Sequence, residues 1–285
     1  MPRLAMTLID VGWGDSLFLE FEDDAGSRSF GLIDSNDTAN NRSSFIYLKR
    51  FFEREKLYET RDHMFDFVLL THAHADHAQG LKAIISHFGT KRFWYPRSLE
   101  WGGTASLLEF ANKTTKNLMG YARRSRKNIL NHQAVDAGNL APNINGTQLD
   151  FLWPAPNFID PHNENENSVV LALKLGAVSF LLTGDAEEKA WKRIANRIPA
   201  DTRVFKVPHH GSDNGFFDGS RKSLWLDDCP QNTMFAISSH VRPFSHPAPS
   251  VEKALKSRDV YRTDQHYHIT FKTDGNSVKV KYSHW

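Results

Sequence analysis

One stretch of the sequence decides the fold: Phe67-Val68-Leu69-Leu70-Thr71-His72-Ala73-His74-Ala75-Asp76-His77. Its first half is a continuous apolar run, which is typical of a buried strand. Its second half places three histidines and one aspartate within six residues. The alternation of His72, His74 and Asp76 would direct their side chains to one side of an extended loop. His77 follows at once, and residues 79–85 carry apolar side chains at helical spacing.

A strand that delivers imidazoles and a carboxylate at its carboxyl end predicts a metal site. This set of donors suits Zn²⁺, Mn²⁺ or iron better than Ca²⁺ or Mg²⁺, which prefer oxygen ligands. The alternative interpretation is a solvated, histidine-rich loop that binds nothing. Such a loop is not expected directly after so apolar a strand, and the metal site is therefore the better interpretation.

The bulk properties of the chain are those of an ordinary globular protein. It has 285 residues, 40% of them hydrophobic and 24% charged, and a formal net charge of +2. This is enough for a sizeable core and leaves the class of partner open. The single cysteine, Cys229, excludes an internal disulfide and favours a reducing compartment. Because no apolar run reaches membrane-spanning length and no signal-peptide pattern is seen, we expect a soluble, cytoplasmic protein with no membrane partner.

The rest of the sequence alternates between strand and helix patterns, in two similar halves. Strands are predicted at residues 4–9, 16–21, 29–33, 67–70, 93–96, 148–154, 168–175, 177–182, 202–207, 233–238, 268–272 and 277–281. Helices are predicted at residues 43–58, 79–85, 187–198 and 251–257, with one or two more between residues 98 and 139. This rhythm predicts an α/β fold.

Four motifs resemble those of a known family. The pattern His72-x-His74-x-Asp76-His77 resembles the HxHxDH signature of the metallo-β-lactamase superfamily. Three further segments resemble the ComEC-type branch, whose members are DNA-uptake proteins: residues 10–15 (Asp-Val-Gly-Trp-Gly-Asp), 183–185 (Thr-Gly-Asp) and 208–212 (Pro-His-His-Gly-Ser). The resemblance implies a four-layered αββα sandwich. We expect residues 1–285 to form a single such domain, with a variable insertion at about residues 98–140.

The resemblance also implies a centre of two divalent ions, zinc or manganese. His72 and His74 would bind the first ion, Asp76 and His77 the second, and Asp185 would bridge them. Either His209 or His210 would complete the second site, and we favour His210. Asp34 would orient the ligands by hydrogen bonds. The alternative for Asp34 is a turn or cap residue, because Ser35, Asn36 and Asp37 also favour a turn.

One segment departs from the superfamily pattern. Lactonase-like and thioesterase-like members carry a Gly-His-Thr-x-Gly segment before the bridging aspartate, whereas this chain has an asparagine-rich run at residues 161–168. The third ligand of the first ion is therefore left open between His162, Glu164 and water. The run could also be only a mobile polar loop.

Two other features are candidates for contact with the substrate. His246, followed by Pro247, could contact a phosphoryl oxygen or protonate a leaving group, so that Asp76 and His246 are the expected catalytic residues. A structural role in a turn is the alternative for His246. A basic cluster, defined here as Arg123, Arg124, Arg126 and Lys127, could hold a nucleic-acid backbone or could be a solvated helix face.

The resemblance favours a phosphodiesterase or nuclease that uses a water activated by two metals on DNA, RNA or a nucleotide, and it leaves a protein partner open. The alternative is a hydrolase of a non-phosphate ester, lactone, thioester or β-lactam, against which the missing Gly-His-Thr segment argues. A binding protein with a vestigial site is a third class. It is not expected with a complete set of ligands, because buried acids and imidazoles are costly without a metal.

Overall fold

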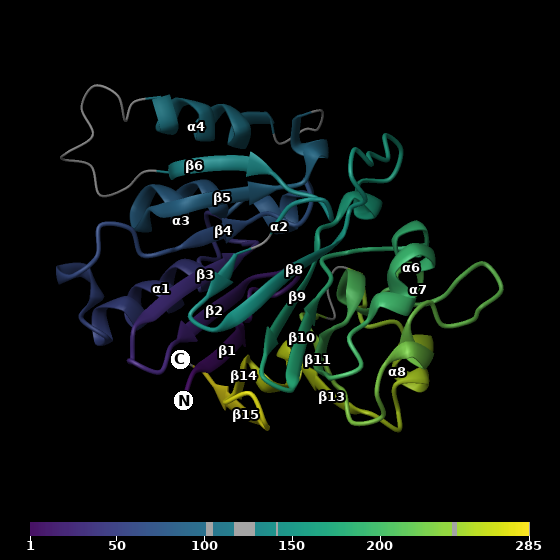
Figure 1. Ribbon diagram of the computed structural model, residues 1–285. Helices are drawn as coiled ribbons and strands as arrows, with labels where there is room; N and C mark the ends of the chain where they lie inside the picture. The colour runs from purple at the N-terminus through teal and green to yellow at the C-terminus, as the bar shows by residue number, and fades with distance from the viewer. Residues whose placement is uncertain (101–104, 117–128, 141, 241–243, 285) are drawn as a thin grey trace.

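A computed structural model describes residues 1–100, 105–116, 129–140, 142–240 and 244–284 of the chain. Figure 1 shows two β-sheets lying face to face, with helices on the two outer sides. The helices α1, α3 and α4 lie beside the first sheet, and α6, α7 and α8 lie beside the second. The predicted αββα sandwich is therefore confirmed.

The first sheet contains both ends of the chain. Its strand order is β15-β14-β1-β2-β3-β4-β5-β6. The strands are β1 Arg3–Leu8, β2 Leu17–Glu22, β3 Arg28–Ile33, β4 Phe67–Leu69, β5 Thr90–Tyr95, β6 Ile129–Ala134, β14 His268–Thr273 and β15 Val278–Ser283. Strands β1, β2 and β3 form an antiparallel meander, and β14 pairs antiparallel with β1. From β3 to β6 the pairing is parallel.

The second sheet comes from the second half of the chain. Its order is β13-β12-β11-β10-β9-β8-β7. The strands are β7 Asn143–Ile144, β8 Thr147–Trp153, β9 Val170–Leu175, β10 Val178–Leu182, β11 Thr202–Lys206, β12 Met234–Ile237 and β13 Asp259–Arg262. Strands β9 and β10 form the predicted hairpin about Gly176, and β10 to β13 run parallel.

The helices cover the outer faces of the two sheets. They are α1 Ser43–Arg54, α2 Ala75–Ala78, α3 Leu81–Phe88, α4 Ala105–Lys116, α6 Glu188–Ile194, α7 Asp213–Phe216, α8 Pro249–Ala254 and α9 Thr263–His266. Short 3₁₀ turns lie at Leu57–Glu59, Arg97–Glu100, Glu164–Asn167, Ala195–Arg197, Pro208–Gly211 and Leu226–Asp228. Within the residues that the structure describes, no helix is long and apolar enough to cross a membrane.

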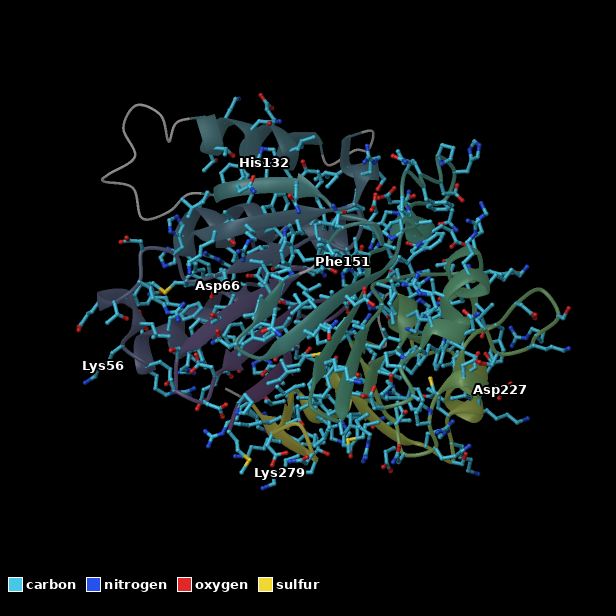
Figure 2. The ribbon with its side chains drawn as sticks, in the orientation of Figure 1. Lys56, Asp66, His132, Phe151, Asp227 and Lys279 are labelled. Atoms are coloured by element: carbon cyan, nitrogen blue, oxygen red, sulfur yellow. The ribbon has the colours of Figure 1, made fainter. Side chains whose placement is uncertain are left out.

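Three apolar layers hold the sandwich together. The central layer lies between the sheets, where Met6, Leu69, Phe151 and Phe180 are buried together. Figure 2 shows Phe151 in the interior, with Lys56 and Lys279 at the periphery. A second cluster packs α1 and α3 on the first sheet, and a third packs α6 and α8 on the second sheet. Burial of these large side chains is the main favourable term in folding, at about 25 cal/mol per Å² of apolar surface.

Most predicted elements are present, with shifts of a few residues at their ends. Three strands were not predicted, β6, β7 and β13. Strand β7 has only two residues, and β6 and β13 have at most one buried side chain each. The predicted helix around Leu107 is α4. A second helix suggested around Tyr121, and the basic cluster Arg123, Arg124, Arg126 and Lys127, lie outside the described residues.

The parallel strands place the candidate site. Strands β3 and β4 of the first sheet end just before Asp34 and the ligand loop of residues 71–77. Strands β10 and β11 of the second sheet end just before Asp185 and the Pro208–Gly211 turn. In open α/β sheets the carboxyl ends of the strands are the usual place for a site. Here the carboxyl ends of strands from two sheets meet.

Candidate metal centre

Asp34 and Thr71 fix the start of the ligand loop. Both carboxylate oxygens of Asp34 accept hydrogen bonds from Thr71, one from its backbone N–H at 2.7 Å and one from its hydroxyl at 2.6 Å. Because this hydroxyl donates its proton to Asp34, it can accept one from Nδ1 of His72, which lies 3.1 Å away. The Nε2 atom of His72 is thereby left with its lone pair, facing the site.

His77 is oriented by the same carboxylate. Its Nδ1 lies 2.8 Å from Oδ2 of Asp34 and donates its proton there. His77 and Asp34 are both completely buried, so this hydrogen bond holds the ring in one orientation. A carboxylate on one ring nitrogen, with the other nitrogen free to bind, is the usual arrangement behind a metal-binding histidine. Asp34 thus lies where an orienting residue is needed.

Asp185 is the point on which four imidazoles converge. The Nε2 atoms of His77 and His210 each lie 3.4 Å from its carboxylate. The Nε2 atoms of His72 and His209 each lie 3.9 Å from it. Ser168 holds the aspartate, because its hydroxyl accepts the backbone N–H of Asp185 at 3.0 Å. A carboxylate surrounded in this way is suited to sharing its two oxygens between two cations.

The two histidines of the Pro208–Gly211 turn both face Oδ2 of Asp185, with Nε2 of His209 at 3.9 Å and Nε2 of His210 at 3.4 Å. Both have positive φ angles, 47° for His209 and 53° for His210, and this backbone turns both rings toward the site. Nδ1 of His210 donates to the carbonyl of Ser238 at 3.1 Å, and Nε2 lies 3.6 Å from Asp76. His210 therefore belongs to the group of Asp76, His77 and Asp185, whose ligand atoms lie within 4.8 Å of one another.

His209 is oriented by a different acid. Its Nδ1 lies 2.9 Å from Oε1 of Glu187. The side chains of Asn163 and Asn165 donate to the same carboxylate, at 2.7 and 2.8 Å. Two asparagines of the unusual 161–168 run therefore position Glu187, which in turn positions His209.

His74 completes the histidines of the ligand loop. Its Nδ1 lies 3.1 Å from Nε2 of His72, and its side chain is exposed. Two imidazole nitrogens at this distance can either hydrogen-bond to each other or bind one cation together. His74 also precedes α2 directly, so the start of this short helix fixes its backbone.

A buried ion pair lies beneath the centre. The Nζ atom of Lys206 is 2.5 Å from Oδ2 of Asp15, and both side chains are about 1% exposed. The other oxygen of Asp15 is 3.6 Å from Nδ1 of His210. Asp15 ends the glycine-containing turn after β1, so this turn reaches under the ligands from the first sheet, while Lys206 comes from β11 of the second.

The pKa values of these groups show a site that attracts positive charge. Burial by itself would lower the pKa of the His77 imidazole, but the carboxylates of Asp185 and Asp34 raise it well above its ordinary value. For His210 burial is again outweighed, and the carboxylates of Asp185 and Asp15 raise its pKa to about 9. Without a metal, protons on these rings offset the charge of the buried acids, which divalent ions would do better.

The polar atoms that lack partners fit a metal. Nε2 of His77, Nε2 of His210 and Oδ1 of Asp185 are buried and have no hydrogen-bond partner within the described part of the chain. Buried polar atoms are normally paired, since an unpaired one costs about 1–3 kcal/mol. These three atoms belong to the cluster that could hold an ion, and their nitrogen and carboxylate donors match zinc or manganese.

The structure separates the two other candidates for a ligand. Glu164 accepts the backbone N–H of Ala73 at 2.9 Å and the hydroxyl of Ser98 at 2.7 Å, while its other oxygen accepts Asn167 at 2.7 Å. Both of its oxygens thus accept hydrogen bonds, and one of them holds the ligand loop through Ala73. His162 is exposed, and its side chain makes no hydrogen bond or ion pair with any residue that the structure describes.

His246 lies beside the centre. Its ring centroid is 6.0 Å from that of His209, and its Nδ1 is buried without a hydrogen-bond partner among the described residues. Burial lowers the pKa of His246, and the neighbouring His210 and His209 lower it further. His246 is therefore held near the ligands in its neutral form, in which one ring nitrogen can donate and the other accept.

Three residues at the site were not singled out as site residues from the sequence. Asp15 appeared only within a turn motif, and Glu187 and Lys206 only within elements. A signal was present for Lys206, which lies between Phe205 and Val207 in an apolar strand, where an unpaired lysine is not expected. Glu187 follows Asp185 by two residues, but nothing in the sequence indicates which histidine it contacts.

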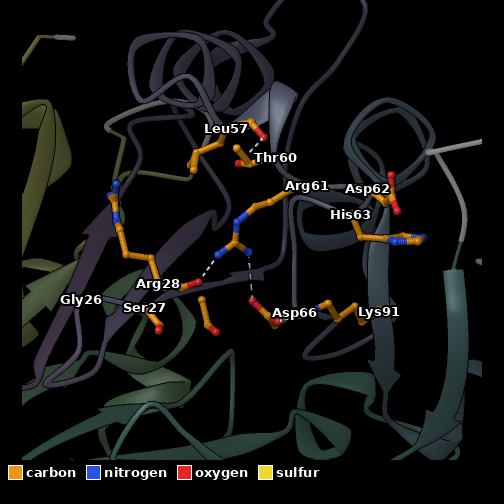
Figure 3. Close-up of a pocket in the computed structure, with 11 residues that line it drawn as sticks. Gly26, Ser27, Arg28, Leu57, Thr60, Arg61, Asp62, His63, Asp66 and Lys91 are labelled. Carbon is orange, nitrogen blue, oxygen red and sulfur yellow. Dashed lines mark hydrogen bonds and ion pairs between the residues drawn. The ribbon is translucent and has the colours of Figure 1, made fainter.

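A large cavity of the protein lies elsewhere, at the opposite ends of the strands. It has a volume of about 620 Å³ and is lined by cations that already have acidic partners. Figure 3 shows Arg61 reaching both the backbone carbonyl of Arg28 and the carboxylate of Asp66. Lys91 also pairs with Asp66, at 2.7 Å, and Arg28 pairs with Glu20 at 2.8 Å. This cavity contributes nothing to the metal centre.

Comparison with solved structures supports the architecture. The metallo-beta-lactamase fold protein YhfI from Bacillus subtilis matches with a TM-score of 0.55 at 12% identity, covering 96% of this chain and all of that one. Igni18, a metallo hydrolase from Ignicoccus hospitalis, matches with a TM-score of 0.50 at 15% identity, covering 94% of this chain and 98% of that one. At such low identities these likenesses establish the fold alone.

Comparison of sequences identifies the family. ComE operon protein 3 of Bacillus subtilis (strain 168) is 26% identical over 275 residues, which are 93% of this chain and 32% of that protein. Competence protein ComA of Neisseria gonorrhoeae is 23% identical over 140 residues, which are 48% of this chain and 19% of that protein. The chain thus spans about a third of the length of the first relative and less of the second. A family model described as the metallo-beta-lactamase superfamily matches residues 7–218. The chain belongs to the metallo-beta-lactamase superfamily of metallo-hydrolases, and its two competence-protein relatives support the ComEC-type branch.

Proposed function

We propose that this protein is a phosphodiesterase that uses two divalent ions, zinc or manganese, on nucleic-acid or nucleotide phosphodiesters. The observation that carries the proposal is the convergence of four imidazole Nε2 atoms on the carboxylate of Asp185, at 3.4 to 3.9 Å. Oδ1 of Asp185 faces His77, and Oδ2 faces His72, His209 and His210, so that both oxygens have imidazole neighbours, as a bridging ligand requires. Two divalent ions that share a ligand supply an activated water and stabilise both oxygens of an in-line displacement.

The side chains divide into two sets. His77, His210 and Asp76 would hold one ion together with Asp185, since their ligand atoms are already close to one another. His72 and His74 would hold the other ion, and the structure favours His209 as the third ligand on that side. In this proposal His209 takes the position that the sequence left open between His162, Glu164 and water. The 161–168 segment would then supply no ligand of its own. Its two asparagines position Glu187, and Glu187 positions His209.

The choice of a phosphodiester rests on the resemblance to the ComEC-type branch. The relatives are a ComE operon protein and a competence protein, and we infer a nucleic-acid substrate from that kinship. His246 has a role in this proposal because it is neutral, half-buried and next to His209. Its neutral N–H would donate a hydrogen bond to a phosphoryl oxygen, whereas the lowered pKa disfavours the other role expected from the sequence, protonation of a leaving group. Glu164 and Asp34 would serve as positioning residues, and His162 would lie outside the centre.

The test is metal-dependent hydrolysis by the purified chain. Protein loaded with Mn²⁺ or with Zn²⁺ is given bis-p-nitrophenyl phosphate, single-stranded DNA, RNA, a lactone, a thioester and a chromogenic β-lactam. We expect cleavage of the phosphodiesters, removal of activity by a chelator, and loss of activity in Asp185→Asn. Cleavage of the lactone, thioester or β-lactam alone would contradict the phosphodiester assignment. Failure to retain any metal would contradict the whole enzymatic proposal.

A further inference from the structure

An exposed aromatic pair lies beside the metal centre and is not used by the chemistry proposed above. It is defined here as the aromatic platform and consists of Trp13 and Phe244. Their ring centroids are 5.4 Å apart at an angle of 67°. Trp13 is 36% exposed and Phe244 is 59% exposed, which places both among the large hydrophobic side chains that the fold leaves in solvent. The two residues come from opposite ends of the chain and from loops of different sheets.

Ring contacts connect the platform to the metal centre without a gap. Phe244 faces His246 with ring centroids 6.0 Å apart and an angle of 27° between the planes. His246 is 6.0 Å from His209, and Nε2 of His209 is 3.9 Å from Asp185. These ring contacts lead from the exposed platform to the carboxylate of Asp185. A group bound to the platform and a group bound at Asp185 would be connected by the two histidines between them.

The backbone of the platform is tied to the site as well. The carbonyl of Trp13 accepts a hydrogen bond from Asn36, two residues after Asp34. The neighbouring Gly14 has a φ of +92° and packs so closely that a Cβ there would lie 2.4 Å from the carbonyl of Asp76. Only glycine allows this approach, and the next residue is the buried Asp15. Trp13 is thus held at the rim by a turn that is anchored under the metal ligands.

We propose that the aromatic platform is a stacking subsite for an unpaired nucleobase of the polynucleotide whose phosphodiester lies at Asp185. This inference rests on the proposed function and adds to it a preference for single strands. A base in a double helix hides its faces against its neighbours, whereas an unpaired base can stack on an exposed ring. Base–aromatic stacking is worth about 1–3 kcal/mol for each base and tolerates any sequence.

The position of the aromatic platform favours a nucleobase as its occupant. An apolar group of any kind could cover an exposed tryptophan, but the platform is continuous with a site proposed to hold a phosphodiester. In a nucleic acid, the flat aromatic group closest along the chain to a phosphodiester is the base of the adjoining nucleotide. A protein partner that covers the same rings is the competing occupant, and the test must distinguish it from a base.

The experiment compares two single-stranded oligonucleotides of equal length, one with bases and one abasic throughout. Their cleavage is measured with the Mn²⁺-loaded wild-type protein and with Trp13→Ala, Phe244→Ala and the double variant. Tyr282→Ala is the control, because Tyr282 is similarly exposed, at 52%, but lies on the edge strand β15. We expect wild-type protein to favour the base-bearing strand. In the double variant the ratio of the two kcat/KM values should fall by about tenfold or more, mainly through KM.

Two conservative variants and one binding measurement separate the outcomes. Trp13→Phe and Phe244→Tyr retain a flat ring and should keep most of the preference. Quenching of Trp13 fluorescence by the base-bearing strand, taken as the difference between wild type and Trp13→Phe, reports stacking without any turnover. Equal loss of activity on both strands in the double variant, or no quenching, would overturn the stacking subsite. Absence of cleavage of every phosphodiester would instead overturn the proposed function.

Discussion

The imidazole of His209 is held by Glu187, with Nδ1 of the histidine 2.9 Å from Oε1 of the acid. The other nitrogen of His209 faces Asp185 at 3.9 Å. This pairing repeats the relationship of His77 to Asp34, and the two histidines face different oxygens of Asp185. It also explains the asparagine-rich segment, since Asn163 and Asn165 both donate to Glu187. The departure from the superfamily pattern at residues 161–168 is thus accompanied by a second histidine oriented by an acid.

Glu187→Gln should weaken metal binding on the His209 side. The amide cannot accept three hydrogen bonds as the carboxylate does, so the His209 ring loses its fixed orientation. Loss of such a partner typically lowers the metal affinity by roughly ten- to a hundredfold. Metal content after dialysis against graded chelator measures the change. Glu188→Gln is the matched control, because Glu188 pairs with Lys192 at the surface. Equal retention of metal by the two variants would contradict a positioning role for Glu187.

His74→Ala should abolish hydrolysis and leave the fold intact. His74 is exposed, so its removal creates no cavity, yet its Nδ1 lies 3.1 Å from Nε2 of His72. We expect activity to fall by about a hundredfold or more, with an unchanged circular dichroism spectrum and loss of one metal equivalent. His284→Ala serves as the control for an exposed histidine near the end of the chain. A His74→Ala variant that is active and still carries both ions would refute the ligand assignment.

Lys206→Met should destabilise the metal-free protein strongly. It removes the cation that lies 2.5 Å from Asp15 and leaves a buried carboxylate without its partner. Breaking a buried pair in this way typically costs about 3–5 kcal/mol. Urea unfolding in the presence of a chelator measures the change. The double variant Asp15→Asn with Lys206→Met removes both charges and should recover part of the loss. If the double variant is less stable than Lys206→Met, the ion pair is not the reason for the cost.

The metal-free protein should lose stability as the pH rises from about 6.5 to about 9. The pKa of His210 is raised to about 9 in the folded chain, against about 6.5 in an unfolded one. A raised folded-state pKa contributes stability that is complete below the unfolded value and is lost as the pH passes the folded value. His77, whose pKa is also raised, acts in the same direction. Thermal unfolding with a chelator across this pH range checks the sign.

The metal-loaded protein should show the opposite trend over the same range. A metal must displace the protons of these rings, so its apparent affinity rises with pH. In the metal-free protein, His210→Gln should reduce the loss of stability that accompanies rising pH. If metal-free wild type unfolds at the same temperature at pH 6 and at pH 9.5, the raised pKa of His210 is not linked to folding.

Neutralising Arg123, Arg124 and Arg126 should weaken binding of polynucleotides and flatten its dependence on salt. This prediction rests on the sequence, because the basic cluster lies outside the described residues. Removing one cation that neutralises a phosphate of a single strand reduces the slope of log K against log salt by about 0.7. Fluorescence anisotropy with a labelled oligonucleotide at several salt concentrations measures it. Replacing the exposed Lys279 and Lys281 of β15 by Gln is the control for a change in net charge. Equal effects of both replacements would identify the cluster as a solvated face.

Local patterns carried much of the architecture. Apolar runs such as residues 67–70 and 168–175 predicted buried strands, because a strand covered on both faces needs apolar side chains throughout. The edge strands β6, β7 and β13 were missed. Strand β7 has only two residues, and β6 and β13 have at most one buried side chain each, so the pattern that marks a strand is weak there. The helix α4 was found from its apolar face.

The sequence alone determined the alternation of strands and helices, because periodicity is a local property of the chain. The sandwich and the candidate metal ligands followed from motifs that resemble the metallo-β-lactamase superfamily, of which the run from His72 to His77 is one. Only the tertiary structure decided how those residues are paired. Asp15 lies beneath His210, Glu187 behind His209, and Trp13 beside Phe244, and each pair joins segments that are far apart in sequence or lie on different loops. Distances across two packed sheets depend on how the sheets are stacked, and no local pattern encodes that.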